Sequence, residues 1–261
     1  MNLLVDPVMH DLTFGVPSLI RGQKKVLNGP AVLEQVGPSI DHLLISQGFD
    51  DHCQPESMQA AATLLPRSAK VVAPPSAAGV LTQYFSEDRI VYLSPGQSCV
   101  LEGGREGGRV MVTATTGDTL GPPWQAPENG YLLRWGEEGG KEGGQSFRSL
   151  YYEPHCRYSV EEFEALRLQA DIVITPVVQQ ILFGAFPLVD GQAKAAALAR
   201  ALKAKVVVPM NNGDIDLSPS RLPLDKLIRK RGTVAEFRRC LTESWPSAKV
   251  VETPVGECVR L

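Results

Sequence analysis

The chain has 261 residues, of which 43% are hydrophobic and 21% charged, and this composition excludes a disordered protein and allows a large buried core. The formal net charge of -3 gives no basic field for a phosphate backbone, so we expect no nucleic acid partner. No apolar run approaches the roughly 20 residues that cross a bilayer, so we expect a soluble protein that is not transmembrane.

Short runs rich in Val, Ile and Leu predict strands along the whole chain. Longer segments with helical spacing of apolar residues separate many of them, and Ser159 is a suitable N-cap for the third. The expected strands cover residues 3–6, 43–46, 70–74, 89–93, 98–102, 109–115, 130–135, 148–153, 171–176, 205–209, 249–252 and 257–261, and the expected helices cover 56–65, 76–85, 159–170, 191–204 and 233–242.

The order of these elements indicates an α/β fold. Strands and helices alternate along much of the chain, but strands follow one another with only a turn between them at 89–115 and 130–153. Such an order is typical of meanders combined with crossovers. We therefore expect two mixed sheets flanked by helices.

The segment 176–191, "PVVQQILFGAFPLVDG", follows a predicted strand and stays apolar without helical or strand regularity. A lid over a pocket, an oligomer contact or a membrane-touching flap would use such a loop. The alternative is that the loop packs on its own core. Both interpretations stay open, and a homo-oligomer or partner contact would use residues 176–189.

The N-terminus and the cysteines bear on where the protein works. The chain begins almost inside its first predicted strand, which suggests that an upstream segment such as a targeting peptide has been trimmed. Five scattered cysteines without a CxxC pair indicate neither a disulfide framework nor a zinc knuckle, and they fit a reducing compartment. Cys53 and Cys156 each follow a histidine, so they are either secondary metal ligands or, as is commoner for free cysteine, small buried residues.

Two of the four histidines, His52 and His155, follow the ends of strong strand signals, where α/β folds place their ligands. Asp51 precedes His52, and imidazole with carboxylate is the usual donor set of a zinc site. His10 lies in an early loop and His42 at the start of a strand, so we expect both to be structural or solvated.

The run "DHLLISQGFDDHC", residues 41–53, resembles the signature loop of the metallo-β-lactamase superfamily, a strand followed by Thr/Ser-His-x-His-x-Asp-His. Gln47 and Phe49 stand where the family has its first two histidines, whereas Asp51 and His52 retain its Asp-His pair. The resemblance implies that this loop has lost the ligands of one metal site and kept those of the other.

Further similarities follow in the order that the family has them, particularly in its UlaG-like branch. Asp6 and Pro7 are similar to its early strand end, and residues 112–133 resemble its middle strand and the Glu-Asn-Gly-Tyr pattern after it. The resemblance therefore implies a single domain over residues 1–261, with the αββα four-layer sandwich of the metallo-β-lactamase fold.

The family's ligand positions outside the loop are all changed. His155 takes the place of the bridging aspartate, and Asn211 takes that of the last histidine. The third histidine is absent, and Thr116, Gly117 or Asp118 lies near its place. One metal site of the family takes its ligands from the positions of Gln47, Phe49 and the third histidine. The resemblance thus implies that this site binds no metal here.

What the resemblance leaves is an atypical, at most mononuclear site formed by Asp51, His52 and His155. Two imidazoles and one carboxylate are used for catalytic zinc with an open position and for non-haem iron. A metal ion there would activate water toward an ester, lactone, thioester or phosphodiester, with Asp51 as ligand or as catalytic base. The expected secondary contacts are Gln47, Asp118, Glu153 and Asn211.

The alternative is a non-catalytic binding or assembly protein on the same fold, without metal. Its polar side chains would hydrogen-bond a polar ligand or one another, and they are Gln47, Thr116, Asp118, Asn211 and Asn212. It would bind a small molecule in its pocket or a partner through residues 176–189. The chain also resembles plastid and cyanobacterial members of the family, which implies the chloroplast stroma, or otherwise the cytoplasm, as its location.

Overall fold

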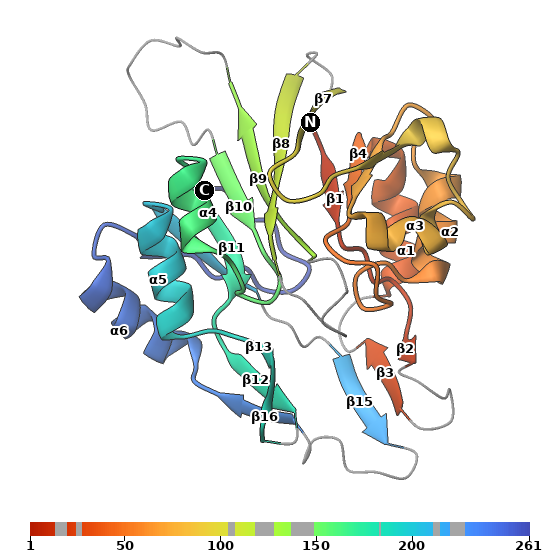
Figure 1. Ribbon diagram of the computed structural model, residues 1–261. Coiled ribbons are helices and arrows are strands. Elements are labelled where there is room, and N and C mark those ends of the chain that lie inside the picture. The colour runs from red at the N-terminus through yellow and green to blue at the C-terminus, as the bar shows by residue number, and fades with distance from the viewer. Residues whose placement is uncertain are drawn as a thin grey trace. The chain divides into compact units, whose positions relative to one another are not determined.

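The structure is a computed structural model that describes residues 1–13, 20–24, 28–103, 108–117, 128–136, 149–182, 184–210, 215–219 and 228–261 (Figure 1). The chain forms two compact units. Unit 1 comprises Met1–Ser94, Leu101–Arg109 and Gly213–Leu224, and unit 2 comprises Pro95–Val100, Val110–Asn212 and Asp225–Leu261.

Unit 1 is built on a four-stranded parallel sheet. Its strands are β1 (Leu3–Val5), β4 (His42–Leu44), β5 (Val71–Ala73) and β6 (Ile90–Tyr92), and they lie in that order. Parallel strands need crossover connections, which the helices between them provide. These helices are α1 (Gly29–Val36), η1 (Gly37–Ser39), α2 (Pro55–Leu64), η2 (Pro75–Ala77), α3 (Ala78–Leu81) and η3 (Glu87–Arg89).

The core of unit 1 lies between this sheet and its three α-helices. Successive strand residues point to opposite faces, so the paired residues Leu43 and Val71 point toward the helices together. There they pack with Leu33 of α1, Met58 of α2 and Leu81 of α3, which are all fully buried. Burial of each such side chain stabilises the fold by roughly 2 kcal/mol.

Unit 2 is built on a seven-stranded mixed sheet. Neighbouring strands among β17, β14, β11 and β10 pair in parallel, whereas β9 pairs antiparallel with β10 on one side and with β8 on the other. The order is β17 (Lys249–Val250), β14 (Val206–Met210), β11 (Ile172–Pro176), β10 (Ser149–Tyr152), β9 (Asn129–Trp135), β8 (Gly108–Thr116) and β7 (Ser98–Gly103).

The core of unit 2 follows one row of residues across this sheet. Leu132, Tyr151, Val173 and Val207 are successive partners in the register of four neighbouring strands, and all four are fully buried. The helices cover this face. The residues that pack on it are Phe163 of α4 (Val160–Ala165), Leu198 of α5 (Ala193–Ala201) and Phe237 of α6 (Val234–Ser244).

Each unit also has a small three-stranded antiparallel sheet. In unit 1 the order is β15 (Ile215–Pro219), β3 (Ile20–Lys24) and β2 (Leu12–Thr13). In unit 2 the order is β13 (Phe186–Val189), β12 (Gln179–Leu182) and β16 (Ile228–Arg231).

The β12–β13 hairpin corrects the expectation that residues 176–191 have no strand regularity. Their register shifts between Gln180 and Ile181, and a bulge of this kind hides the period-two pattern in the sequence. Ile181 and Val189 are buried, so part of the segment packs inside unit 2. The partner contact expected of residues 176–189 stays a prediction, and Phe183 lies outside the described residues.

The α/β fold with two main sheets and flanking helices is confirmed. The mixed pairing lies in the seven-stranded sheet, whereas the described pairs of the four-stranded sheet are parallel. The predicted strand at 257–261 is wrong, because these exposed residues pair with no strand of the described chain. The helix predicted at 76–85 is divided into η2 and α3. Within the described ranges, no helix is both long and apolar enough to cross a membrane.

Candidate metal centre

In unit 1, the end of β1 places a carboxylate beside the loop that follows β4. The two strands pair in parallel, and the backbone N–H of Asp6 donates to the carbonyl oxygen of Leu44 at 3.0 Å. Ser46 donates its backbone N–H to Asp6 Oδ1 at 2.7 Å and its hydroxyl to Asp6 Oδ2 at 2.5 Å. The carboxylate is thereby fixed at the start of the loop.

This carboxylate orients His52. The Nδ1 atom of His52 lies 2.9 Å from Asp6 Oδ2 and 3.2 Å from Ser46 Oγ, and only 8% of the residue is exposed. Because a carboxylate accepts the Nδ1 proton, the contact favours the tautomer with its lone pair on Nε2, the arrangement common to metal-binding histidines. Asp6 has a left-handed backbone with φ of 41°, which aspartate tolerates better than most residues.

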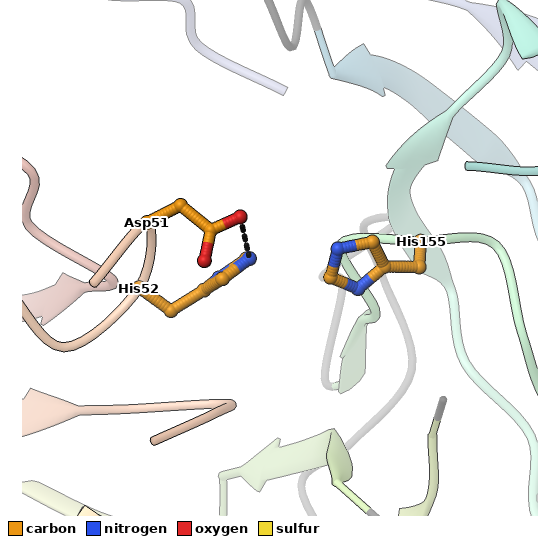
Figure 2. Close-up of side chains that lie close together, drawn as sticks. All are labelled: Asp51, His52 and His155. Carbon is orange, nitrogen blue, oxygen red and sulfur yellow. Dashed lines mark ion pairs between the residues drawn. The ribbon is translucent and has the colours of Figure 1, made fainter. Parts of the chain in front are cut away.

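Asp51 lies beside the other ring nitrogen of His52. Its Oδ2 is 3.7 Å from Nε2 (Figure 2), which is too long for a hydrogen bond. Two ligand atoms bound to one tetrahedral zinc at about 2.0–2.1 Å lie about 3.4 Å apart, so this spacing suits two donors of one ion. The Asp51 side chain is 41% exposed, so an ion could reach it.

The two residues that replace histidines in this loop have different positions. Gln47 is buried, and the side chain of Phe49 is on the surface with 40% of the residue exposed. The carbonyl oxygen of Phe49 accepts the backbone N–H groups of His52 at 2.9 Å and Cys53 at 2.7 Å. Phe49 therefore shapes the turn with its backbone and offers no ligand.

Gly48 is required where it stands. A Cβ at this position would lie 2.6 Å from the backbone carbonyl of Ser76, so any side chain would push the loop away from η2. Two further predicted contacts of the site, Asp118 and Asn211, lie outside the described residues.

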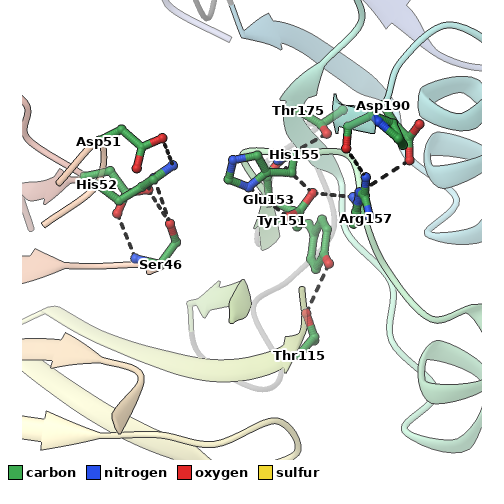
Figure 3. Close-up of polar contacts among 12 residues, drawn as sticks. Ser46, Asp51, His52, Thr115, Tyr151, Glu153, His155, Arg157, Thr175 and Asp190 are labelled. Carbon is green, nitrogen blue, oxygen red and sulfur yellow. Dashed lines mark hydrogen bonds and ion pairs between the residues drawn. The ribbon is translucent and has the colours of Figure 1, made fainter. Parts of the chain in front are cut away.

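In unit 2, the turn after β10 positions His155. The backbone N–H of Glu153 donates to the carbonyl oxygen of Ile174 at 3.2 Å, so the pairing with β11 continues one residue beyond β10. The Oε2 atom of Glu153 then accepts the backbone N–H groups of His155 at 3.1 Å and Arg157 at 2.6 Å (Figure 3). Cys156, between them, has a left-handed φ of 56°.

His155 is buried, and its Nδ1 atom lies 4.0 Å from Glu153 Oε1. Its carbonyl oxygen accepts the backbone N–H of Asp190 at 2.8 Å. Arg157 strengthens this connection, because its Nη2 donates to the carbonyl oxygen of Pro187 at 2.6 Å and its Nε lies 3.6 Å from Asp190 Oδ2. The β12–β13 hairpin is thus tied to the His155 turn.

The cysteines that follow the two histidines are core residues. Cys53 and Cys156 are fully buried, each within the hydrophobic core of its unit. Burial raises the pKa of the Cys53 thiol to about 12 and also raises the pKa of the Cys156 thiol. Their complete burial among core side chains supports the interpretation of small buried residues over that of secondary ligands.

Comparisons with known proteins agree with this fold. The family model for "Beta-lactamase superfamily domain" matches residues 1–211. The chain is similar to an isothiocyanate hydrolase from Delia radicum gut bacteria, with 15% identity, a TM-score of 0.57, and coverage of 99% of this chain and 92% of that one. It is also similar to a predicted metal-dependent hydrolase from Parabacteroides distasonis, with 16% identity, a TM-score of 0.50, and coverage of 82% and 76%. No curated protein sequence matches the chain.

Proposed function

Because this chain belongs to the β-lactamase superfamily, we propose that it is a hydrolase-like protein in which Asp51, His52 and His155 hold one divalent metal ion. The observation that carries the proposal is the pair in unit 1, where His52 Nε2 and Asp51 Oδ2 lie 3.7 Å apart while Asp6 holds Nδ1. His155 belongs to unit 2, and its part in the site rests on the proposal.

The donor set suits such an ion. The three side chains offer one carboxylate oxygen and two imidazole nitrogens, a set used for catalytic zinc with an open position and for non-haem iron. A divalent metal bound there supplies Lewis acidity toward a carbonyl or phosphoryl oxygen. The proposed substrates are therefore an ester, lactone, thioester or phosphodiester.

Asp6 and Asp51 have different roles in the proposed site. Asp6 fixes the tautomer and direction of His52. Asp51 serves as a ligand in this proposal, because a carboxylate bound to a metal is a poor base for the same reaction. The proposed location in the chloroplast stroma depends on the resemblance alone and is tested by following a fluorescent fusion of the protein in plant cells.

Metal content tests the proposal directly. Protein purified without a metal-affinity step and then equilibrated with zinc or iron is expected to carry about one tightly bound ion per chain by elemental analysis. His52→Ala and His155→Ala are each expected to reduce this to under about a tenth of an equivalent, because a two-ligand site binds far more weakly. His10→Ala, in another loop, is the matched control and should bind as wild type.

Two results would contradict the proposal. Wild-type protein without bound metal would exclude the site and favour the non-catalytic binding protein. Full binding by His155→Ala would show that His155 is not a ligand of the ion. If metal binds, a panel of nitrophenyl ester, lactone, thioester and phosphodiester substrates tests the chemistry, and turnover lost in His52→Ala is the expected outcome.

A further inference from the structure

We infer that Glu153 is a positioning residue that sets the tautomer and orientation of the His155 imidazole and is not itself a metal ligand. The use of that imidazole for metal rests on the proposed function. The contacts that carry the inference all lie within unit 2.

Glu153 extends strand β10 into the core. Its backbone bond to Ile174 continues the pairing with β11, so its side chain projects from the same face of the sheet as Tyr151. The carboxylate is 1% exposed. Gly130 of β9 leaves room for these side chains, because a Cβ there would lie 2.6 Å from the Tyr151 hydroxyl and 3.2 Å from Glu153 Cγ.

A carboxylate buried to this degree needs hydrogen-bond donors. Glu153 Oε2 finds two of them in the backbone N–H groups of His155 and Arg157. These donors lie on either side of Cys156, whose left-handed backbone is unfavourable for a residue with a side chain. The carboxylate therefore holds a turn that would otherwise relax, and this turn carries His155.

The second oxygen of the Glu153 carboxylate influences which nitrogen of the His155 imidazole carries the proton. Glu153 Oε1 lies 4.0 Å from His155 Nδ1, which exceeds hydrogen-bond length but is close enough for its negative charge to favour a proton on Nδ1. The lone pair is then on Nε2. In unit 1, Asp6 Oδ2 is hydrogen-bonded to His52 Nδ1 at 2.9 Å, so both predicted ligand histidines have a carboxylate on the Nδ1 side, nearer in His52 than in His155.

These contacts distinguish positioning from ligation. An oxygen that already accepts two backbone N–H groups has little remaining capacity for an ion. The other oxygen faces the ring nitrogen of His155. Glu153 therefore affects a bound ion through His155, as carboxylate partners of metal-binding histidines do.

Glu153→Gln tests the inference, because glutamine keeps the size and an acceptor oxygen but removes the charge. Nitrogen NMR of metal-free wild-type protein is expected to show His155 mainly with its proton on Nδ1, and the signal is identified by its loss in His155→Ala. In Glu153→Gln the Nε2–H tautomer should gain population. The affinity for zinc should fall about 10- to 100-fold.

Asp171→Asn is the matched control. Asp171 Oδ2 accepts the hydroxyl proton of Ser149 at 2.7 Å and pairs with Lys205, and it braces the same two strands at their opposite ends. This variant should change neither the His155 tautomer nor the zinc affinity. Asp171 is partly buried, with 19% of its side chain exposed. A general effect of removing a carboxylate charge from these two strands would affect both variants alike.

The outcomes separate this inference from the proposed function. An unchanged tautomer in folded Glu153→Gln would overturn the inference, and so would a wild-type His155 with its proton on Nε2, a measurement that does not depend on the variant folding. Wild-type protein that shows the Nδ1–H tautomer but binds no zinc would support positioning by Glu153 while excluding the metal site.

Discussion

His42 is a buried histidine whose two ring nitrogens both contact the backbone. Its Nε2 donates to the carbonyl oxygen of Glu102 at 3.1 Å, and its Nδ1 accepts the N–H of Lys70 at 3.1 Å, so the ring is neutral in the folded chain. Burial lowers the pKa of His42 most, with smaller opposing effects from Glu102 and Asp41 that raise it. The prediction that His42 is structural agrees with these contacts.

The lowered pKa of His42 predicts how stability depends on pH. The unfolded chain takes up the proton near pH 6.5, whereas the folded chain resists it, so the stabilisation is present above pH 6.5 and is lost as the pH falls. The free energy of unfolding is measured in urea between pH 7 and 5. Its slope against pH should be smaller in His42→Gln than in wild type, by at most about 1.4 kcal/mol per pH unit. His10→Gln is the control, and equal slopes for wild type and His42→Gln would contradict the prediction.

At the candidate site, the sequence predicts the three proposed metal ligands but not the carboxylates that orient the two histidines. The sequence predicts Asp51, His52 and His155 as site residues, because they follow strand ends and match a motif. The sequence indicates Asp6 only as a strand end, because its contact with His52 depends on the pairing of β1 with β4, which are distant in sequence. Glu153 was expected as a secondary contact, and only the structure shows its bonds to the turn.

At the scale of the element, helix α5 is followed, just after its C-cap Leu202, by a lysine in a conformation that favours glycine. Lys203 has φ of 56°, its N–H donates to Arg200, and the next N–H, of Ala204, donates to Ala199 at 2.8 Å. This is the Schellman arrangement, in which a left-handed residue with a Cβ is strained. Arg167 after α4 has the same conformation, with φ of 50°.

Lys203→Gly should therefore stabilise the protein by about 0.5–1 kcal/mol, because glycine adopts the left-handed conformation without strain. Arg200→Gly, inside the same helix, should destabilise it by about 1 kcal/mol. Urea unfolding of both variants measures the two effects. Destabilisation by Lys203→Gly would show that the lysine side chain contributes more than its backbone costs.

Capping residues and apolar periodicity in the sequence predict most of the helices and strands of the sheets. Ser159 caps α4 as expected, since its hydroxyl accepts the N–H of Glu162 at 3.1 Å. The sequence pattern does not indicate helix α1, although Asn28 caps it, because its eight residues begin with Gly29 and Pro30, a pair that is typical of turns. The sequence does not indicate strands β12 and β13, although they form a local hairpin, because the register shift between Gln180 and Ile181 interrupts the period-two pattern.

At the scale of the whole molecule, the proposed site takes Asp51 and His52 from unit 1 and His155 from unit 2. An ion bound only by the folded chain stabilises it by about 2.7 kcal/mol when free metal is at 100 times the Kd. For a chain of this size, that corresponds to a rise in Tm of roughly 5–10 °C. Zinc should produce this rise in wild type, and a chelator should reverse it.

His52→Ala and His155→Ala should each abolish the rise, although they change different units, because each removes one of three ligands. Cys258 is an exposed thiol that could bind zinc adventitiously, so Cys258→Ser is the control and should keep the full rise. A rise that survives His155→Ala but not His52→Ala would assign the ion to unit 1 alone. The proposed ligand set requires both units, so only loss of the rise in both variants agrees with it.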